Sequence, residues 1–278
     1  MKFVKMQGTG NDFLFVEPVG GERDWGSLAR AMCDRYFGAG ADGLMLVLPS
    51  KAADVRMRLF NADGSEAEVS GNGVRCLVKY VIERGLALPK DGRIVVEATS
   101  GPLVAEVTGD RRVESVRLSM GAPRFEPKDV PVETDAPSPV VDMPLQAAGR
   151  SLAVTCLSMG NPHAVLFVDG PVEEYPLQDV GPAVESHPAF PARVNFGVAR
   201  VVSPGRMDVR VWERGVGETL ACGSGCCAAM VAAHLHGRVG DKVDIKQPGG
   251  SLVVEWDGTG DVYLSGPAEF VYEGEWPD

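Results

Sequence analysis

Residues 212–236 read WERGVGETLACGSGCCAAMVAAHLH, and the rest of the chain is organised around this segment. The alternating, Val-rich segment Met207–Trp212 predicts a strand, which the glycines that follow it would end. Cys226–Leu235 is small, apolar and uncharged, a composition typical of a buried helix. The stretch therefore predicts a strand, a glycine-rich loop and a packed helix in succession.

Cys222 stands at the start of this helix, in the loop sequence Cys222-Gly-Ser-Gly225. A helix N-terminus presents unpaired N–H groups and the positive end of the helix dipole. Glycines at such a place let a ligand approach the backbone closely. We therefore expect an anion-binding site and a thiol of lowered pKa at Cys222. The alternative is a buried structural cysteine ahead of a packed helix.

A second copy of this unit lies upstream. Val55–Phe60 predicts a strand, Asn61–Gly64 a turn and Val74–Ile82 an apolar helix. The copies align without a gap, and the equivalent residues are Arg58 and Arg210, Phe60 and Trp212, Glu66 and Glu218, Ser70 and Cys222, Gly71 and Gly223, and Gly73 and Gly225. Two copies predict two similar domains, whose facing helix N-termini would bind one small anionic ligand.

The boundary between the predicted domains lies in residues 121–139, which are rich in proline and mixed in charge. We expect an N-terminal domain of residues 1–120 plus 268–278 and a C-terminal domain of residues 121–267. A shorter repeat supports the division, because Gly10–Glu17 resembles Gly160–Asp169.

Composition narrows the function classes. The chain has 278 residues, of which 45% are hydrophobic and 23% charged, as in ordinary soluble globular proteins. A net charge of −11 argues against a nucleic-acid partner. The N-terminus lacks the apolar run of a signal peptide, and no segment has the apolar length to span a bilayer. We expect a cytoplasmic protein with a small-molecule partner.

The cysteines suggest neither a metal site nor a disulfide framework. No Cys-x-x-Cys pair occurs among the six cysteines, and His234 and His236 are wrongly spaced for a zinc finger.

Gly38–Gly43 matches the pattern Gly-x-Gly-x-x-Gly, but a predicted helix precedes it and a predicted strand follows it. A dinucleotide site requires the reverse order, so no nucleotide cofactor is expected.

In combination, several motifs resemble those of the diaminopimelate epimerase family, over essentially the whole chain. They are Gly10-Asn-Asp-Phe13, Asn61-Ala-Asp-Gly64, Gly71-Asn-Gly-Val-Arg75, Asn161-Pro-His163, Arg193-Val-Asn195, Glu213-Arg-Gly215 and Ala221-Cys-Gly-Ser-Gly225. The resemblance implies an α/β (α+β) fold of two pseudo-symmetric domains. In each, a mixed or antiparallel sheet wraps around a central helix, and the active site lies in the interdomain cleft. It also implies a homodimer that needs neither metal nor pyridoxal phosphate.

The resemblance also assigns residues to the site. It implies that Cys222, Ser70, His163 and Glu213 take part in proton transfer. It implies that the substrate-binding residues are Asn11, Asn61, Gly71, Asn72, Asn161, Asn195, Glu213, Arg214, Gly223 and Ser224. From the residues alone, His163 fits a polar side chain packed near a turn equally well.

The expected reaction interconverts LL- and meso-2,6-diaminopimelate, an amino acid of lysine and peptidoglycan biosynthesis. Inversion needs a base on one face of the α-carbon and an acid on the other, and thiols suit both roles. In the family, a cysteine precedes the Gly-Asn-Gly motif, whereas this chain has Ser70. A hydroxyl is a far weaker acid and a poor base without an activating neighbour.

Three explanations of Ser70 are open: a replacement that disables the site while keeping its shape, a one-sided or hydroxyl-assisted mechanism, and another substrate or role. Three functions are likewise open: a diaminopimelate epimerase, a related racemase or lyase that acts on another substrate, and a catalytically disabled form that still binds substrate.

Overall fold

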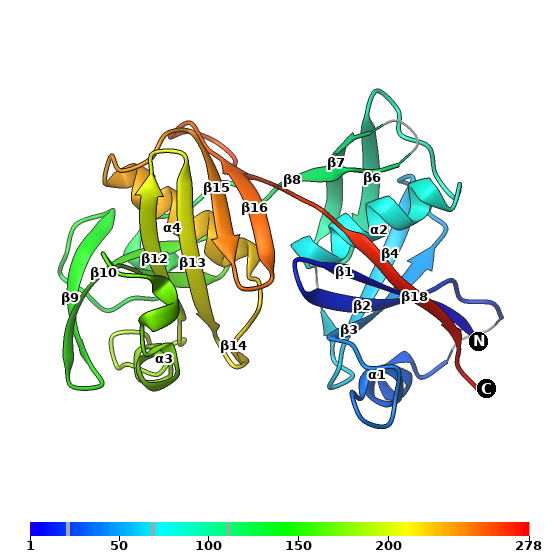
Figure 1. Ribbon diagram of the computed structural model, residues 1–278, viewed down its shortest axis with the longest axis horizontal. Helices are drawn as coiled ribbons and strands as arrows, with labels where there is room; N and C mark the ends of the chain where they lie inside the picture. Colours follow the sequence, from blue (N-terminus) through cyan, green and yellow to red (C-terminus); the bar gives the residue numbers. More distant parts are fainter. Residues whose placement is uncertain (21–22, 68–69, 110–111, 278) are drawn as a thin grey trace. The chain divides into compact units, whose positions relative to one another are not determined.

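The computed structural model describes residues 1–20, 23–67, 70–109 and 112–277, and the chain divides into two compact units (Figure 1). Unit 1 comprises Met1–Ser119 and Ser265–Asp278, and unit 2 comprises Met120–Leu264. The chain thus returns to unit 1 at its C-terminal end. There the last strand, β18 (Glu269–Glu275), pairs with the first, β1 (Lys2–Gly8).

In its described residues, unit 1 is a mixed sheet with two helices. Its other elements are β2 (Asn11–Val16), α1 (Trp25–Cys33), β3 (Gly43–Leu48), β4 (Val55–Asn61), β5 (Glu66–Ala67), α2 (Gly71–Glu83), β6 (Arg93–Ala98), β7 (Gly101–Thr108) and β8 (Ser115–Ser119). The pairs β2–β3 and β4–β6 are parallel, whereas β1–β2, β3–β4, β4–β5, β6–β7 and β7–β8 are antiparallel.

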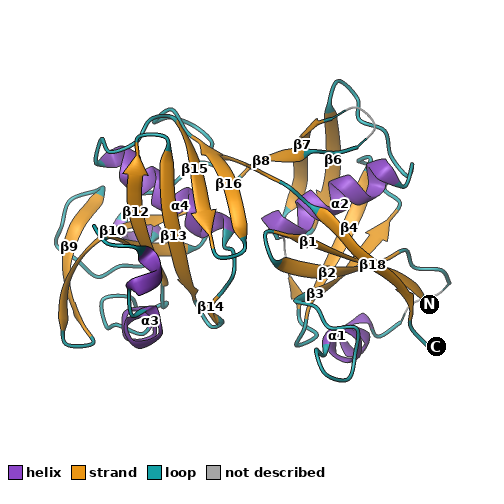
Figure 2. Cartoon of the chain, in the orientation of Figure 1, coloured by secondary structure: helices purple, strands orange, loops and turns teal. Residues whose placement is uncertain are grey.

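Unit 2 repeats this plan (Figure 2). Its elements are η1 (Pro127–Asp129), β9 (Val140–Ala147), β10 (Arg150–Ser158), β11 (Pro162–Phe167), η2 (Val172–Glu174), α3 (Leu177–Glu185), β12 (Asn195–Ser203), β13 (Arg206–Glu213), β14 (Gly217–Glu218), α4 (Gly223–Leu235), β15 (Lys242–Gln247), β16 (Gly250–Glu255) and β17 (Tyr263–Gly266), the last of which runs into unit 1. Again two pairs, β11–β12 and β13–β15, are parallel. The pairs β9–β10, β10–β11, β12–β13, β13–β14 and β15–β16 are antiparallel.

The internal repeat predicted from the sequence is confirmed in detail. Helices α2 and α4 are each 13 residues long and begin directly after the equivalent residues Ser70 and Cys222. The equivalent ion pairs also form, because Arg58 Nε and Arg210 Nε each lie 2.7 Å from a glutamate oxygen, on Glu66 and Glu218 respectively. The two units are therefore pseudo-symmetric versions of one α+β fold.

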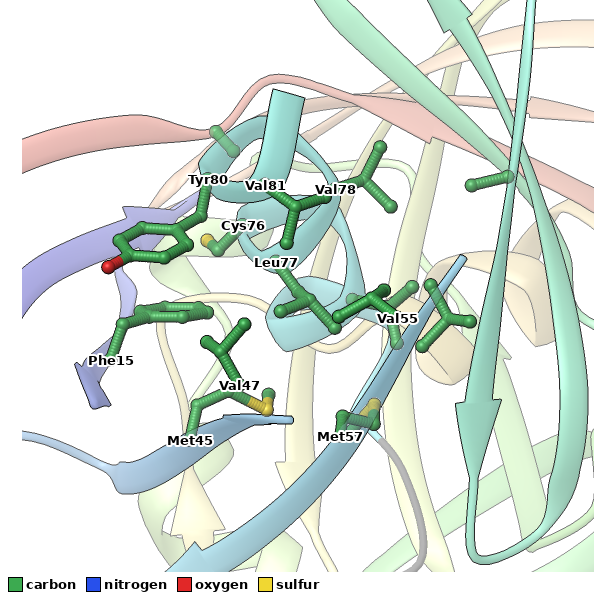
Figure 3. Packing of buried hydrophobic residues seen from close by; sticks show 14 of the residues in the cluster. Phe15, Met45, Val47, Val55, Met57, Cys76, Leu77, Val78, Tyr80 and Val81 are labelled. Carbon is green, nitrogen blue, oxygen red and sulfur yellow. The ribbon is translucent and has the colours of Figure 1, made fainter. Parts of the chain in front are cut away.

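Helix α2 is the centre of unit 1 and packs against β1, β2, β6 and β8. Its apolar face joins the sheet residues shown in Figure 3, where Leu77 lies between Val47 and Val55. Full burial of such a side chain contributes about 1.5–3 kcal/mol. The helix also buries Lys79, whose Nζ donates to Val113 O at 2.7 Å and pairs with a Glu83 oxygen at 3.0 Å. Sheet strands surround this helix, as expected.

Helix α4 is the centre of unit 2 and packs against β10, β11, β12, β13 and β16. Nine of its residues are buried, four of them alanine, so strands approach it on several sides. Close approach also explains one glycine, because a Cβ at Gly225 would lie 2.7 Å from Val211 Cγ2. The small residues of this stretch thus place the N-terminus of α4 directly against β13.

Candidate active site

In unit 2, the predicted site residues gather where strand ends meet a helix N-terminus. Strands β11 and β12 run parallel, so both begin at the same end of the sheet, with His163 opposite Asn195. Strand β13 is antiparallel to β12, so it ends there, at Glu213. Cys222 is the N-cap of α4. We call this group the unit 2 half-site: Asn161, His163, Asn195, Glu213, Arg214, Cys222, Gly223 and Ser224.

The reactive group expected here, the Cys222 thiol, is buried. Its Sγ lies 3.6 Å from Ser224 Oγ. The Glu213 carboxylate also interacts with the thiol, and Glu213 Oε1 accepts a hydrogen bond from Thr219 Oγ1 at 2.5 Å. The thiol therefore stands between a hydroxyl and a carboxylate, with Thr219 fixing the carboxylate.

The expectation of a lowered pKa at Cys222 is wrong. Burial raises the pKa of this thiol well above its ordinary value, and the negative charge and hydrogen bond of Glu213 raise it further. The Ser224 hydroxyl and the Gly225 N–H at the helix end do lower the pKa, but they do not outweigh the loss of hydration. Cys222 is consequently a thiol at neutral pH and is suited to donate a proton.

His163 is held as a neutral imidazole. Burial lowers its pKa to about 3, and the positive charge of Arg214 acts in the same direction. Its Nε2 lies 2.9 Å from Asn161 Oδ1, so Nε2 carries the proton and donates it to that oxygen. The Asn161 Nδ2 in turn donates to Ser224 Oγ at 3.3 Å. A continuous chain of contacts thus connects His163 to the thiol.

Asn195 fixes the backbone of the half-site. Its Nδ2 donates to Pro162 O at 2.8 Å, and its Oδ1 accepts from Arg214 N at 2.9 Å. Arg214 also donates from Nη1 to Ala192 O at 3.0 Å. The buried Asn195 side chain therefore joins the starts of β11 and β12 to the loop after β13.

In unit 1, the equivalent group comprises Asn11, Asn61, Ser70, Gly71 and Asn72, which we call the unit 1 half-site. Asn72 Nδ2 donates to Asn11 Oδ1 at 3.2 Å, and Asn11 Nδ2 donates to Asp42 Oδ2 at 2.6 Å. Asn72 is buried, and among the residues that the structure describes its Oδ1 has no hydrogen-bond partner. Asn61 bonds within its own turn, to Ser65 Oγ at 2.9 Å.

Ser70 is the N-cap of α2, and its Oγ accepts from Gly73 N at 3.2 Å. Cys222 occupies the same place on α4 with a similar extended backbone, but its side chain makes no cap hydrogen bond. Ser70, the equivalent of Cys222 in the repeat, therefore also stabilises the helix, since serine is among the best N-caps.

Two residues that hold the half-sites, Asp42 and Gln247, are not among those predicted from the sequence. Asp42 holds Asn11, and Arg35 Nη2 bonds both Asp42, at 2.7 Å, and Asp12, at 2.9 Å. The local signal for Asp42 is the Gly38–Gly43 motif, whose pattern is that of a nucleotide-binding loop. Gln247 contacts the Cys222 backbone and has no local signal in the sequence.

Among the described residues, no group of three or more His, Cys, Asp or Glu side chains could hold a metal ion.

Comparison with known proteins identifies the family. The family model described as diaminopimelate epimerase matches residues 3–126 and 155–271. The chain belongs to the diaminopimelate epimerase family. A diaminopimelate epimerase of Desulforudis audaxviator is 49% identical over 279 residues, covering 99% of each chain. A second relative of that name, from Pelotomaculum thermopropionicum, is 48% identical and covers 100% of this chain and 99% of its own.

Solved structures show that the fold is shared more widely than this family. A PhzF-family phenazine biosynthesis protein of Bacillus anthracis aligns with a TM-score of 0.70 at 17% identity, covering 100% of this chain and 99% of its own. A probable proline racemase of Agrobacterium radiobacter aligns with a TM-score of 0.67 at 17% identity, covering 99% and 92%. No described helix is long and apolar enough to cross a membrane.

Proposed function

We propose that this chain is an isomerase that epimerises diaminopimelate at Cα, interconverting the LL and meso forms without a cofactor. The observation that carries the proposal is the repeated helix N-cap. Ser70 and Cys222 occupy the same place on equivalent helices of pseudo-symmetric units. In this proposal, these two groups serve the two faces of one α-carbon. Membership of the diaminopimelate epimerase family supports the substrate.

In this proposal, Cys222 exchanges a proton with Cα on one face. As a thiol it donates directly. To act as base, it first loses its proton, and the Glu213 carboxylate is placed to accept it. The chain of contacts through Ser224 and Asn161 to His163 orients the sulfur. The neutral His163 has an unprotonated Nδ1, an acceptor that suits it to assist proton transfer.

Substrate binding is assigned to the remaining residues of the half-sites. The backbone N–H groups of Gly71 and Asn72, and of Gly223 and Ser224, lie in the first turns of α2 and α4. Such groups bind a carboxylate and stabilise the negative charge that develops on proton removal. The Asn72 Oδ1 atom offers an acceptor for an ammonium group. Asn11, Asn61, Asn161, Asn195 and Arg214 supply further polar contacts.

Ser70 limits the rate in this proposal. A hydroxyl can return a proton to a carbanion but is a poor base, so exchange on the Cys222 face should exceed inversion. The test is incubation with LL- and with meso-diaminopimelate in deuterium oxide, with deuterium at Cα and isomer composition followed together. We expect exchange faster than inversion in the unchanged chain and fast inversion in Ser70→Cys. Absence of both exchange and inversion in both proteins would refute the assignment.

A homodimer, which the family resemblance implies, and a cytoplasmic location are further proposals. Light scattering coupled to gel filtration tests the first, with an expected mass twice the 29.5 kDa of one chain. A mass of one chain at micromolar concentration would contradict it. Cell fractionation tests the second, and recovery from membranes or medium would contradict it.

A further inference from the structure

Gln247, the last residue of β15, holds the backbone of Cys222 from both sides. The Cys222 N–H donates to Gln247 Oε1 at 2.6 Å, and Gln247 Nε2 donates to Cys222 O at 3.2 Å. Nε2 also contacts Sγ of Cys226, one turn further along α4. Only 4% of Gln247 is exposed, so these hydrogen bonds have little competition from water.

The two N-caps explain why unit 2 needs this contact. In unit 1, Ser70 fixes itself by accepting from Gly73 N. Sulfur is a weak acceptor, so the approach of the Gly225 N–H to the Cys222 sulfur is not a cap hydrogen bond of that kind. The residue of unit 1 that corresponds to Gln247 is Ala98, the last residue of β6. Its methyl side chain has no hydrogen-bond donor or acceptor. The unit with the thiol therefore has a restraint that the unit with the serine lacks.

The hairpin of β15 and β16 fixes Gln247 in turn. Gln247 pairs with Gly250 across the hairpin, and in the turn between them Gly249 N donates to Leu220 O at 2.7 Å. The hairpin thus holds the chain at Leu220 and at Cys222, on either side of Ala221. A rigid two-stranded element determines where the thiol-bearing residue lies.

We propose that Gln247 is a positioning residue for proton transfer, which holds the Cys222 backbone so that its sulfur stays aligned with the substrate α-carbon. The inference rests on the proposed function. A displacement of about 1 Å in a reacting group can cost about 100-fold in rate. Gln247 touches no reacting atom in this proposal and acts only through Cys222.

The first test measures the thiol without turnover. Gln247→Leu removes both hydrogen bonds to Cys222, and the control Gln146→Leu removes one at an exposed position of β9, to Ser151 Oγ. Alkylation of each cysteine in the free protein is followed by mass spectrometry. We expect Gln247→Leu to accelerate Cys222 by about tenfold or more, because local opening exposes the sulfur. Cys156 and Cys227, also in unit 2, should keep their rates, as should Cys222 in Gln146→Leu.

The second test measures turnover, in the Ser70→Cys protein so that the rate is large. Gln247→Leu should lower kcat by about 100-fold and change KM by less than about twofold, since alignment rather than binding is lost. In Gln247→Glu, only the protonated carboxyl group can both donate to and accept from the Cys222 backbone. Its kcat, relative to that of the parent at the same pH, should therefore recover as the pH is lowered.

The outcomes separate the possibilities. Unchanged Cys222 alkylation and unchanged kcat in Gln247→Leu would overturn the inference, as would a rise in KM alone. If Cys227 also becomes reactive, the helix has opened as a whole. Recovery of Gln247→Glu at low pH then supports positioning, and its absence contradicts it. If no variant epimerises diaminopimelate but Cys222 still responds to Gln247→Leu, the proposed function fails while the restraint on the thiol stands.

Discussion

His163 donates from Nε2 to Asn161 Oδ1 over 2.9 Å, and this contact fixes both the tautomer of the imidazole and the orientation of the amide. Because the amide oxygen faces His163, its Nδ2 is turned toward Ser224 Oγ, which lies beside the Cys222 sulfur. Protonation of His163 would place a charge in a fully buried position close to the positive Arg214. The half-site thus depends on a histidine that stays neutral.

This dependence predicts how stability varies with pH. The pKa of His163 is lowered to about 3 in the folded chain, from 6.5, so between these values the unfolded chain binds more protons. The contribution of neutral His163 to the free energy of unfolding is fully present above about pH 6.5, and it is lost as the pH falls toward 3. From pH 7.5 to 5, the loss should be about 2 kcal/mol in the free energy of unfolding. Urea unfolding of wild type and His163→Gln at both values measures it.

The comparison needs only the change between the two pH values, so the intrinsic cost of His163→Gln cancels. The variant should lose less stability on acidification than the wild type, by about the same 2 kcal/mol. Equal losses in the two proteins would mean that His163 titrates normally in the folded chain.

A second prediction concerns Glu213 and the thiol. The carboxylate raises the pKa of Cys222 in addition to burial, so Glu213→Gln should lower that pKa. The pH dependence of Cys222 alkylation between pH 7 and 11 would then shift to lower pH, and the rate at pH 8 would increase. Cys156 provides the internal control, since burial alone raises its pKa to about 12. A Cys222 profile that stays where it was would show that Glu213 does not act on the thiol.

The parts of the molecule that repeat, or that have local patterns, are predictable from the sequence. The equivalence of Arg58 with Arg210 and of Ser70 with Cys222 was visible without coordinates, and the ion pairs and N-caps confirm it. Helix starts are local events, set by a cap residue and the glycines after it. They could therefore be placed to within a few residues.

The remaining features depend on contacts between distant residues. Asp42 reaches Asn11 across adjacent parallel strands, and Gln247 reaches Cys222 from a strand that begins after the helix ends. Neither contact leaves a periodic or spacing signal. The pKa of Cys222 was expected in the wrong direction for a related reason, because helix ends are visible in a sequence whereas burial of one sulfur atom is not.

The two ion pairs of the repeat offer a matched stability prediction. In unit 2, the side chains of Arg210 and Glu218 are 13% and 18% exposed, whereas in unit 1 those of Arg58 and Glu66 are 33% and 37% exposed. Glu218→Gln should cost about 1–3 kcal/mol, since it leaves a nearly buried guanidinium poorly compensated. Glu66→Gln should cost about 0–1 kcal/mol. Chemical denaturation of both variants tests the order, and an equal or reversed cost would contradict it.

The last prediction separates the two roles of Ser70. Its hydroxyl caps α2 through Gly73 N, and a thiol or a methyl group would lose most of that hydrogen bond. Ser70→Cys and Ser70→Ala should therefore both destabilise the chain by about 1 kcal/mol. Only Ser70→Cys restores a group that can take and give the proton, so it alone should raise epimerisation, by about 100- to 10,000-fold. Thermal denaturation and the deuterium assay measure the two effects separately. If Ser70→Cys gains activity while Ser70→Cys and Ser70→Ala lose the same stability, then serine at this position favours helix stability over catalysis. If Ser70→Cys stays inactive on diaminopimelate although folded, the hydroxyl is not what limits turnover, and another substrate must be sought.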